Sequence, residues 1–262
     1  MTLKQRYDPV VFDRKNVFMQ RLADFVRLGF AHYVVGEVRA DRAWPLAMKF
    51  RRLYEVHLHR NQRARLRAHG EASAYCLWWQ PYAGTVVFAL LLTKGPHAAR
   101  QLEKVRDAAE REGRLVLGDY ELVQRPRPGQ QRAAWTWRLT EVAYEGWRAR
   151  VLQVVRGGND FTVQQLVDDL MATPGFAGVR EQVKKLKALF KSEWKRRRGN
   201  QPAVVLPRQR FVQRLTNRGT LLSSLVAAQR DGVGAMAQTT ALGSPASQLP
   251  LVPAASVLGS VC

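Results

Sequence analysis

The stretch ASAYCLWWQPYAGTVVFALLLT, residues 72–93, decides the fold. Its two apolar runs, Ala72–Gln80 and Thr85–Thr93, have the composition of β-strands and flank the residues PYAG, which are a hairpin signal. The second run is apolar without a break from Val86 to Leu92, as is typical of a central strand that is buried on both faces. The stretch therefore predicts an antiparallel hairpin in the middle of a sheet.

Alternating β-like and helical patterns surround this hairpin. A β-branched run, Ala31–Ala40, precedes a helical pattern that Asp41 can cap. After the hairpin the spacing predicts a surface helix, two strands and another helix, at His97–Glu110, Arg114–Gln124, Ala133–Thr140 and Glu141–Arg156. The order is β-α-β-β-α-β with one more strand and helix, which predicts an α+β, ferredoxin-like (split βαβ) antiparallel sheet domain. Its helices are expected on one face of the sheet, with the other face left free.

The chain is expected to divide into three parts. The sheet domain covers residues 1–156 and includes an N-terminal helix at Lys15–Leu28. Residues 159–218 follow as a basic helical module with helices at Val163–Met171 and Val179–Arg198. These two helices are helix-turn-helix-like, with a turn at Ala172–Gly178 that is longer than usual. Residues 219–262 are expected to be a mostly disordered tail, because no charged residue occurs from Gly232 onward.

The charge balance indicates an anionic partner. Lys and Arg total 42 against 21 Asp and Glu, a net charge of +21. Such a surplus repels itself unless an anion neutralises it, and phosphate backbones are the commonest such anion because each contact releases a counterion. An Arg-rich composition without nucleic-acid binding, and binding to an acidic membrane surface, are the alternatives. The clustering of the charge favours nucleic acid.

Several sequence features bear on the compartment. Cys76 and Cys262 are the only cysteines, so no disulfide framework or CxxC metal pair is expected, and a reducing compartment fits. The first residues lack the apolar core of a signal peptide, and no run of about 18 apolar residues could span a membrane. We therefore expect a cytoplasmic protein without a membrane partner. The sequence does not indicate an oligomeric state.

The predicted helix Val179–Arg198 is the strongest candidate for a binding surface. Five apolar residues form one stripe that would dock on the protein: Val179, Val183, Leu186, Phe190 and Trp194. Basic residues on the remaining surface could contact phosphates or enter a DNA groove: Arg180, Lys184, Lys185, Lys187, Lys191, Lys195, Arg196, Arg197 and Arg198. The alternative is a solvated helix that is charged for solubility. The scarcity of acids, Glu181 and Glu193 alone, favours contact with nucleic acid.

A second basic cluster follows the helical pattern that begins at Asp41. Its predicted contact residues are Arg60, Arg63, Arg65 and Arg67, interleaved with Asn61 and Gln62. Arginines next to amide side chains suit contacts with phosphates and base edges. The alternative, which we weigh equally, is that several of these side chains only cover apolar surface.

His57–Leu58–His59 has the spacing of a metal-binding motif. In rolling-circle replication and conjugation nucleases a His-x-His pair on a central strand binds one metal, and a Tyr on a nearby helix attacks the DNA. Nothing in this sequence singles out Tyr54 or Tyr144 for that role. The pair in this chain ends a helical pattern, where residues two apart point in different directions. No phosphate-binding glycine loop or serine nucleophile motif occurs either. We therefore assign no catalytic, cofactor-binding or metal-binding residue.

Aromatic residues on the predicted strands could stack on bases. Trp135 and Trp137 share one strand face, as do Tyr75 and Trp79. Base stacking is the use that RNA-recognition sheets make of such pairs. Packing in the core beneath the helices is the favoured interpretation.

Five segments between Arg27 and Arg198 carry a resemblance: AHYVVGEVRADRAWPLAMKF, VHLHRNQRARLRAHG, GDYELV, AWTWRLT and PGFAGVREQVKKLKALFKSEW. They resemble uncharacterised proteins of proteobacterial plasmids and integrative elements. The resemblance implies a bacterial cytosol and a mobile-element context, and it brings no catalytic residues with it.

These observations together favour a non-catalytic nucleic-acid-binding protein, with DNA favoured over RNA, that acts in the maintenance, transfer or regulation of a mobile element. Two alternatives stay open. One is a replication-initiation or mobilisation nuclease of the His-x-His/Tyr type, and the other is a scaffold that binds an acidic protein partner.

Overall fold

The computed structural model describes residues 7–127, 129–199 and 204–229. It is an α+β protein, as expected, built around a mixed sheet of six strands in the order β5-β2-β4-β3-β1-β9. The strands are β1 (Val10–Phe12), β2 (His32–Arg39), β3 (Ala74–Tyr82), β4 (Thr85–Leu92), β5 (Arg106–Asp107) and β9 (Gly219–Leu221). Strand β1 pairs in parallel with β3, and the other neighbours pair antiparallel.

The predicted hairpin is confirmed as β3 and β4. The register pairs Ala74 with Leu92 and Trp78 with Phe88, with an irregularity between Trp79 and Tyr82 before the turn. Gly84 takes a positive φ of 84° there, a conformation that glycine adopts without strain. Side chains of β4 alternate between the hydrophobic clusters on the two faces of the sheet, so the strand is buried on both faces as its unbroken apolar run indicates.

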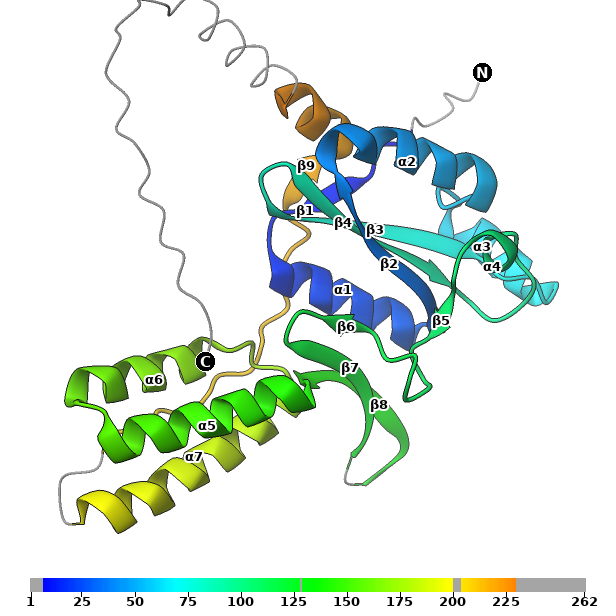
Figure 1. Ribbon diagram of the computed structural model, residues 1–262. Helices are drawn as coiled ribbons and strands as arrows, with labels where there is room; N and C mark the ends of the chain where they lie inside the picture. Colours follow the sequence, from blue (N-terminus) through cyan, green and yellow to red (C-terminus); the bar gives the residue numbers. More distant parts are fainter. Residues whose placement is uncertain (1–6, 128, 200–203, 230–262) are drawn as a thin grey trace, which may run out of the picture.

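Helices cover both faces of this sheet, which corrects the expectation of a free face (Figure 1). Helix α2 (Ala40–Tyr54) packs on one face through Ala43, Ala47 and Phe50. Helix α1 (Lys15–Arg27) packs on the other through residues that include Phe18 and Leu22. The apolar stripe of the N-terminal helix needs a surface to cover, and the second sheet face provides it.

The chain after the hairpin differs from the expected helix and strand. Of the predicted helix His97–Glu110 only α4 (Ala99–Leu102) forms, and β5 pairs with β2 at the edge of the main sheet. The predicted strands Arg114–Gln124 and Ala133–Thr140 do not extend that sheet. They form a separate sheet of β6 (Val116–Leu117), β7 (Tyr120–Arg127) and β8 (Gln130–Leu139). Trp137 of β8 is fully buried against α1, where its Nε1 donates to the Met19 carbonyl at 2.8 Å.

Three helices form the part of the molecule at the lower left of Figure 1: α5 (Glu141–Gly157), α6 (Asp160–Ala172) and α7 (Ala177–Arg198). Thr140 and Asn159 cap the first two by accepting from backbone N–H groups of Ala143 and Thr162. One hydrophobic cluster joins all three helices. Helix α5 therefore packs with the helical module, although the expected boundary at residues 157–159 placed it with the sheet domain.

Residues 204–229 run back from the helical module to the sheet, where β9 pairs with β1. A helix at 222–229 follows and buries Leu222, Leu225 and Val226 against the α2 face. The start of the expected tail, residues 219–229, is thus part of the folded protein, because its aliphatic residues complete that cluster. The rest of the expected tail, 230–262, lies outside the described residues.

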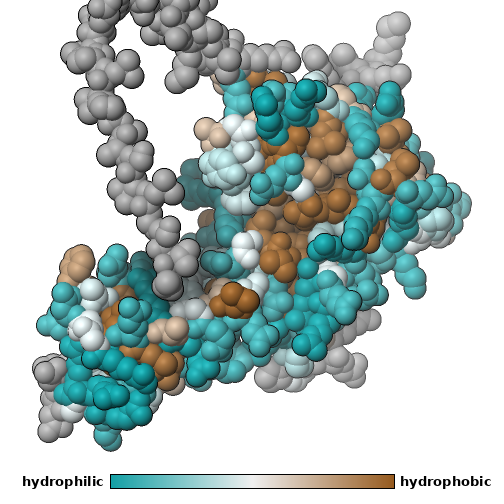
Figure 2. Space-filling view, viewed as in Figure 1, coloured by the Kyte–Doolittle hydropathy of each residue, from teal (hydrophilic) through white to brown (hydrophobic). Residues whose placement is uncertain are grey.

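On the face of the molecule drawn in Figure 2, hydrophilic residues cover most of the helical module, and hydrophobic residues gather over the sheet domain. Within the described part of the chain, no helix combines the length and the apolar character that crossing a membrane requires.

Candidate nucleic-acid interface

Helix α7 docks through the predicted apolar stripe. Val179, Val183, Leu186, Phe190 and Trp194 are all buried, and the stripe packs partly on the α1 side of the sheet and partly against α5 and α6. The side chains at most of the remaining positions are exposed or half-buried. The periodicity thus determines which face of α7 is available to a ligand, and that face is basic.

Both acids of α7 are neutralised within the protein. Arg125 forms an ion pair with Glu181, and its hydrogen bond holds the pKa of that carboxyl below its ordinary value. Glu193 accepts from Arg196 and Arg156, and these hydrogen bonds, that of Arg196 first, lower its pKa in the same way. The helix carries nine basic residues and two acidic ones, so most of its positive charge has no acidic partner on the helix itself.

The nine basic side chains of α7 are not equivalent. Arg198 donates to the carbonyls of Val155 and Gly158 and lies over the Trp194 ring at 4.7 Å from its centroid. Arg196 is held by Glu193, so these two arginines stabilise the helical module. Lys184, Lys185, Lys191, Lys195 and Arg197 are exposed and take part in no ion pair within the part of the chain that the structure describes.

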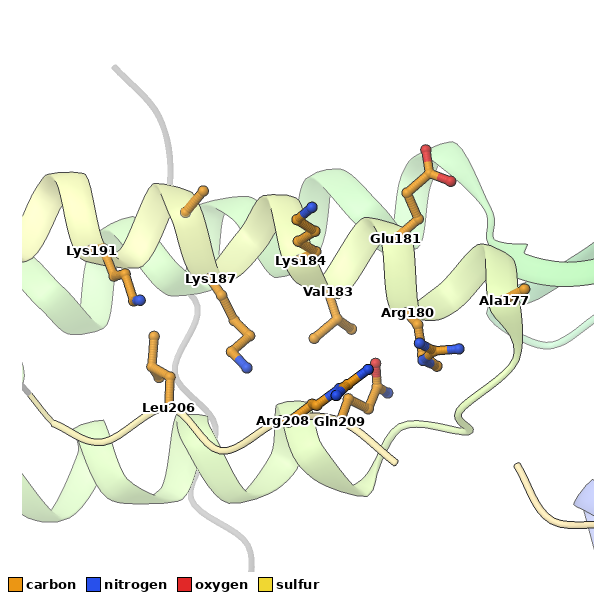
Figure 3. A pocket seen from close by; sticks show the side chains of 11 residues that line it. Ala177, Arg180, Glu181, Val183, Lys184, Lys187, Lys191, Leu206, Arg208 and Gln209 are labelled. Carbon is orange, nitrogen blue, oxygen red and sulfur yellow. The ribbon is translucent and has the colours of Figure 1, made fainter. Parts of the chain in front are cut away.

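A groove runs along α7 and is closed on its other side by the chain from Leu206 to Gln209 (Figure 3). Its volume is about 680 Å³. Five basic side chains line it: Arg180, Lys184, Lys187 and Lys191 from α7, and Arg208 from the opposite wall. Figure 3 shows Lys187 and Lys191 pointing across the groove, and Glu181 pointing away from it.

The opposite wall of the groove is fixed to the protein at several points. The Lys187 ammonium donates to the Pro207 carbonyl, and Arg180 lies 3.3 Å over the centre of the Phe211 ring. Val212 N–H donates to the Gly175 carbonyl at 3.1 Å. A side chain at Gly175 would come within 2.0 Å of the Arg210 carbonyl, so the wall depends on glycine at that position.

Like charges crowd the groove. Partial burial, followed by the positive charge of Lys191, lowers the pKa of Lys187. The groove therefore holds cations that repel one another, and a bound anion would relieve that repulsion.

The second basic cluster forms α3 (Arg60–Ala68). Arg60, Arg65 and Arg67 are exposed there, whereas Arg63 is half-buried. Arg63 donates to the Leu58 carbonyl at 2.5 Å and lies 4.9 Å over the Tyr75 ring, so it stabilises the fold. Helices α3 and α7 lie at opposite ends of the molecule in Figure 1, and the structure does not bring the two predicted clusters together.

His57 and His59 lie in the turn between α2 and α3, and not on a strand. The His57 ring packs edge-on near Tyr7, and the His59 N–H donates to Gln62 at 2.9 Å. In residues 7–127, 129–199 and 204–229, no group of three His, Cys, Asp or Glu side chains could hold a metal ion. The nuclease alternative requires both histidines on one strand, and His57 and His59 do not lie on a strand.

The tyrosines named for the nuclease alternative contribute to the hydrophobic clusters of the protein. Tyr54 is fully buried, and its hydroxyl donates to the Glu103 carboxylate at 2.6 Å. Burial raises the pKa of the Tyr54 hydroxyl above its ordinary value. Tyr144 packs against the cluster of the helical module. The strand aromatics behave as expected of core residues, since Trp137 is fully buried and Tyr75, Trp79 and Trp135 pack against the same cluster.

Sequence reasoning missed the second wall of the groove. Arg208 and Gln209 come from an irregular segment whose only signal is local basic composition, and nothing in it indicates that it runs beside α7. Long-range contacts of this kind leave no periodic pattern.

Comparison with known proteins finds no match: no family model, no curated protein and no solved structure matches the chain.

Proposed function

We propose that this protein binds nucleic acid without catalysing a reaction, and that the basic face of α7 and the groove beside it are the binding site. One observation carries the proposal: the helix keeps a surplus of positive charge after both of its acids have been neutralised by arginines. Phosphate backbones are the partners that such a surface attracts most strongly, because every phosphate contact releases a counterion.

The wider setting rests on the resemblance to proteins of plasmids and integrative elements. On that basis we propose that the binding serves the maintenance, transfer or regulation of a bacterial mobile element in the cytoplasm. The preference for DNA over RNA stays a prediction, and the experiment below compares the two ligands directly.

The architecture supports two finer assignments. Strands β2, β3, β4 and β5 follow one another in a β-α-β-β-α-β order with the spatial order β5-β2-β4-β3, and α2 and Ala99 of α4 pack on the same face. We infer a ferredoxin-like unit at 32–107 from this order. Helices α6 and α7, joined by residues 173–176, are the candidate helix-turn-helix pair, with α7 as its basic member.

The proposal is tested by reversing charge on α7. We expect Lys184→Glu, Lys185→Glu and Lys191→Glu together to weaken binding of labelled DNA at least about tenfold, because each lysine contributes a phosphate contact. The measurement is a fluorescence anisotropy titration at several salt concentrations, with RNA of the same length as a second ligand.

A matched variant controls for net charge. Lys94→Glu, Lys104→Glu and Arg111→Glu also reverse three exposed basic residues, and they lie outside the helical module. An equal loss in both variants would contradict a site on α7. Absence of binding to either nucleic acid would overturn the proposal and favour an acidic protein partner.

A further inference from the structure

The groove beside α7 has two walls, and this limits what can enter it. A helix that reads duplex DNA lies in a major groove about 12 Å wide and needs access on both of its flanks. One flank of α7 is packed against the protein, and the flank from which Lys187 and Lys191 point faces residues 206–209 (Figure 3). A duplex cannot enter between the two walls and would meet the outer surface of α7, where Lys185 lies, whereas a single extended chain fits between the walls.

The spacing of the cations suits such a chain. Arg180, Lys184, Lys187 and Lys191 follow one another along one line of the helix, about 4.5–6 Å apart along its axis. Arg208 adds a charge from the opposite wall. A row of cations inside a groove is the arrangement with which proteins follow the backbone of single-stranded nucleic acid.

Gln209 adds a hydrogen-bond acceptor to the groove, which a ligand made only of phosphates could not use. Its side chain lines the groove although the residue is only 8% exposed. Its Nε2 donates to the Thr173 carbonyl at 3.0 Å and to Thr173 Oγ1 at 2.7 Å. The carbonyl can only accept, so the amide orientation is determined. Its Oε1 is thereby left as a buried acceptor without a hydrogen-bond partner among the described residues.

A buried acceptor without a partner costs free energy unless a ligand donates to it. In DNA the ionised phosphodiester and the deoxyribose carry no hydrogen-bond donor, whereas every base carries N–H donors on its Watson–Crick edge. These donors are occupied in a duplex and available in a single strand. The buried acceptor and the row of cations therefore both favour a single-stranded nucleic acid as the ligand.

We propose that the groove between α7 and residues 206–209 binds single-stranded nucleic acid, with phosphates on the lysines and an unpaired base donating to Gln209 Oε1. This inference rests on the proposed function and adds the form of the ligand to it.

Two matched variants on the same helix test where the strand lies. Lys191→Glu places a carboxylate in the groove, and Lys185→Glu makes the same charge change on the outer surface of the helix. We expect Lys191→Glu to weaken binding of single-stranded DNA at least about fivefold and Lys185→Glu to weaken it less than about twofold. The wild-type protein should bind the single strand more tightly than a duplex of the same sequence.

A third variant tests the role of the base. We expect Gln209→Met to remove the preference of the wild-type protein for a single strand over an abasic strand of the same length. The dependence of affinity on salt should stay unchanged, because no phosphate contact is lost. Thr173→Val is the matched control: it removes a hydrogen bond of the same glutamine outside the groove, and it should keep the preference for bases. Thermal unfolding of both variants confirms that they fold.

The outcomes separate this inference from the proposed function. Equal or tighter binding of duplex, equal losses in Lys191→Glu and Lys185→Glu, or a preference for bases that survives Gln209→Met would each overturn the single-strand groove while nucleic-acid binding stands. Failure of the wild-type protein to bind any nucleic acid would overturn both.

Discussion

His32 and His97 resist protonation in the folded protein. Partial burial lowers the pKa of both imidazoles, and the nearby Arg100 guanidinium lowers it further. The Asp107 carboxylate, 3.9 Å from His32 Nε2, acts in the opposite direction but is outweighed. The two residues should therefore couple the stability of the sheet edge to pH.

The sign of this coupling follows from the direction of the shift. The unfolded chain has histidines with a pKa of about 6.5 and so binds more protons than the folded protein as the pH falls below that value. The free energy of unfolding should then decrease as the pH falls from about 7.5 to about 5.5. The measurement is urea unfolding at both values. His32→Gln with His97→Gln should flatten this dependence, and an unchanged slope in that variant would contradict the assignment.

At the scale of elements, the segment at residues 219–229 is the least expected part of the fold. Leu222 is fully buried between the sheet and α2, whereas its neighbour Leu221 is 46% exposed. We expect Leu222→Ala to lower the free energy of unfolding by about 2–5 kcal/mol, because it leaves a cavity in a packed core. Leu221→Ala is the matched control and should cost less than about 1 kcal/mol. Similar small effects of both, measured by urea unfolding, would show that this segment does not contribute to the core.

The elements that could be predicted from sequence are those with a strong local period. The hairpin β3–β4 and the stripe of α7 follow from unbroken or helical apolar patterns, and both lie within a residue or two of the predicted bounds. Strands β1 and β9 are three residues each, too short to show a period, and they form only because distant parts of the chain pair. The segment His97–Glu110 has few apolar residues, so its tendency to form a helix is weak. Residues 106–107 therefore pair with β2 as strand β5 and do not continue a helix.

At the scale of the whole molecule, the sequence could identify the basic residues but not their grouping. The two clusters are similar in composition, yet α3 and α7 lie at opposite ends of the protein (Figure 1). Only the α7 cluster gains a second wall, because residues 204–212 pass beside it on their way back to the sheet. That path depends on contacts such as Gln20 with Gln213 and Leu215, nearly two hundred residues apart, which no local pattern encodes.

The separation of the clusters predicts a dependence on ligand length. At physiological salt, screening limits the electrostatic attraction of each cluster to about 8 Å. A short ligand bound at α7 should therefore not be attracted by the charges of α3. For an oligonucleotide of about six nucleotides, we expect Arg60→Glu, Arg65→Glu and Arg67→Glu together to weaken binding less than about twofold. A long single strand can reach both ends of the protein, and there the losses from α3 and α7 reversal should combine additively in free energy. Anisotropy titrations of the two ligands measure this. If α3 reversal weakened short-ligand binding as much as the α7 variant, the binding site would extend across the molecule and would not be confined to the groove.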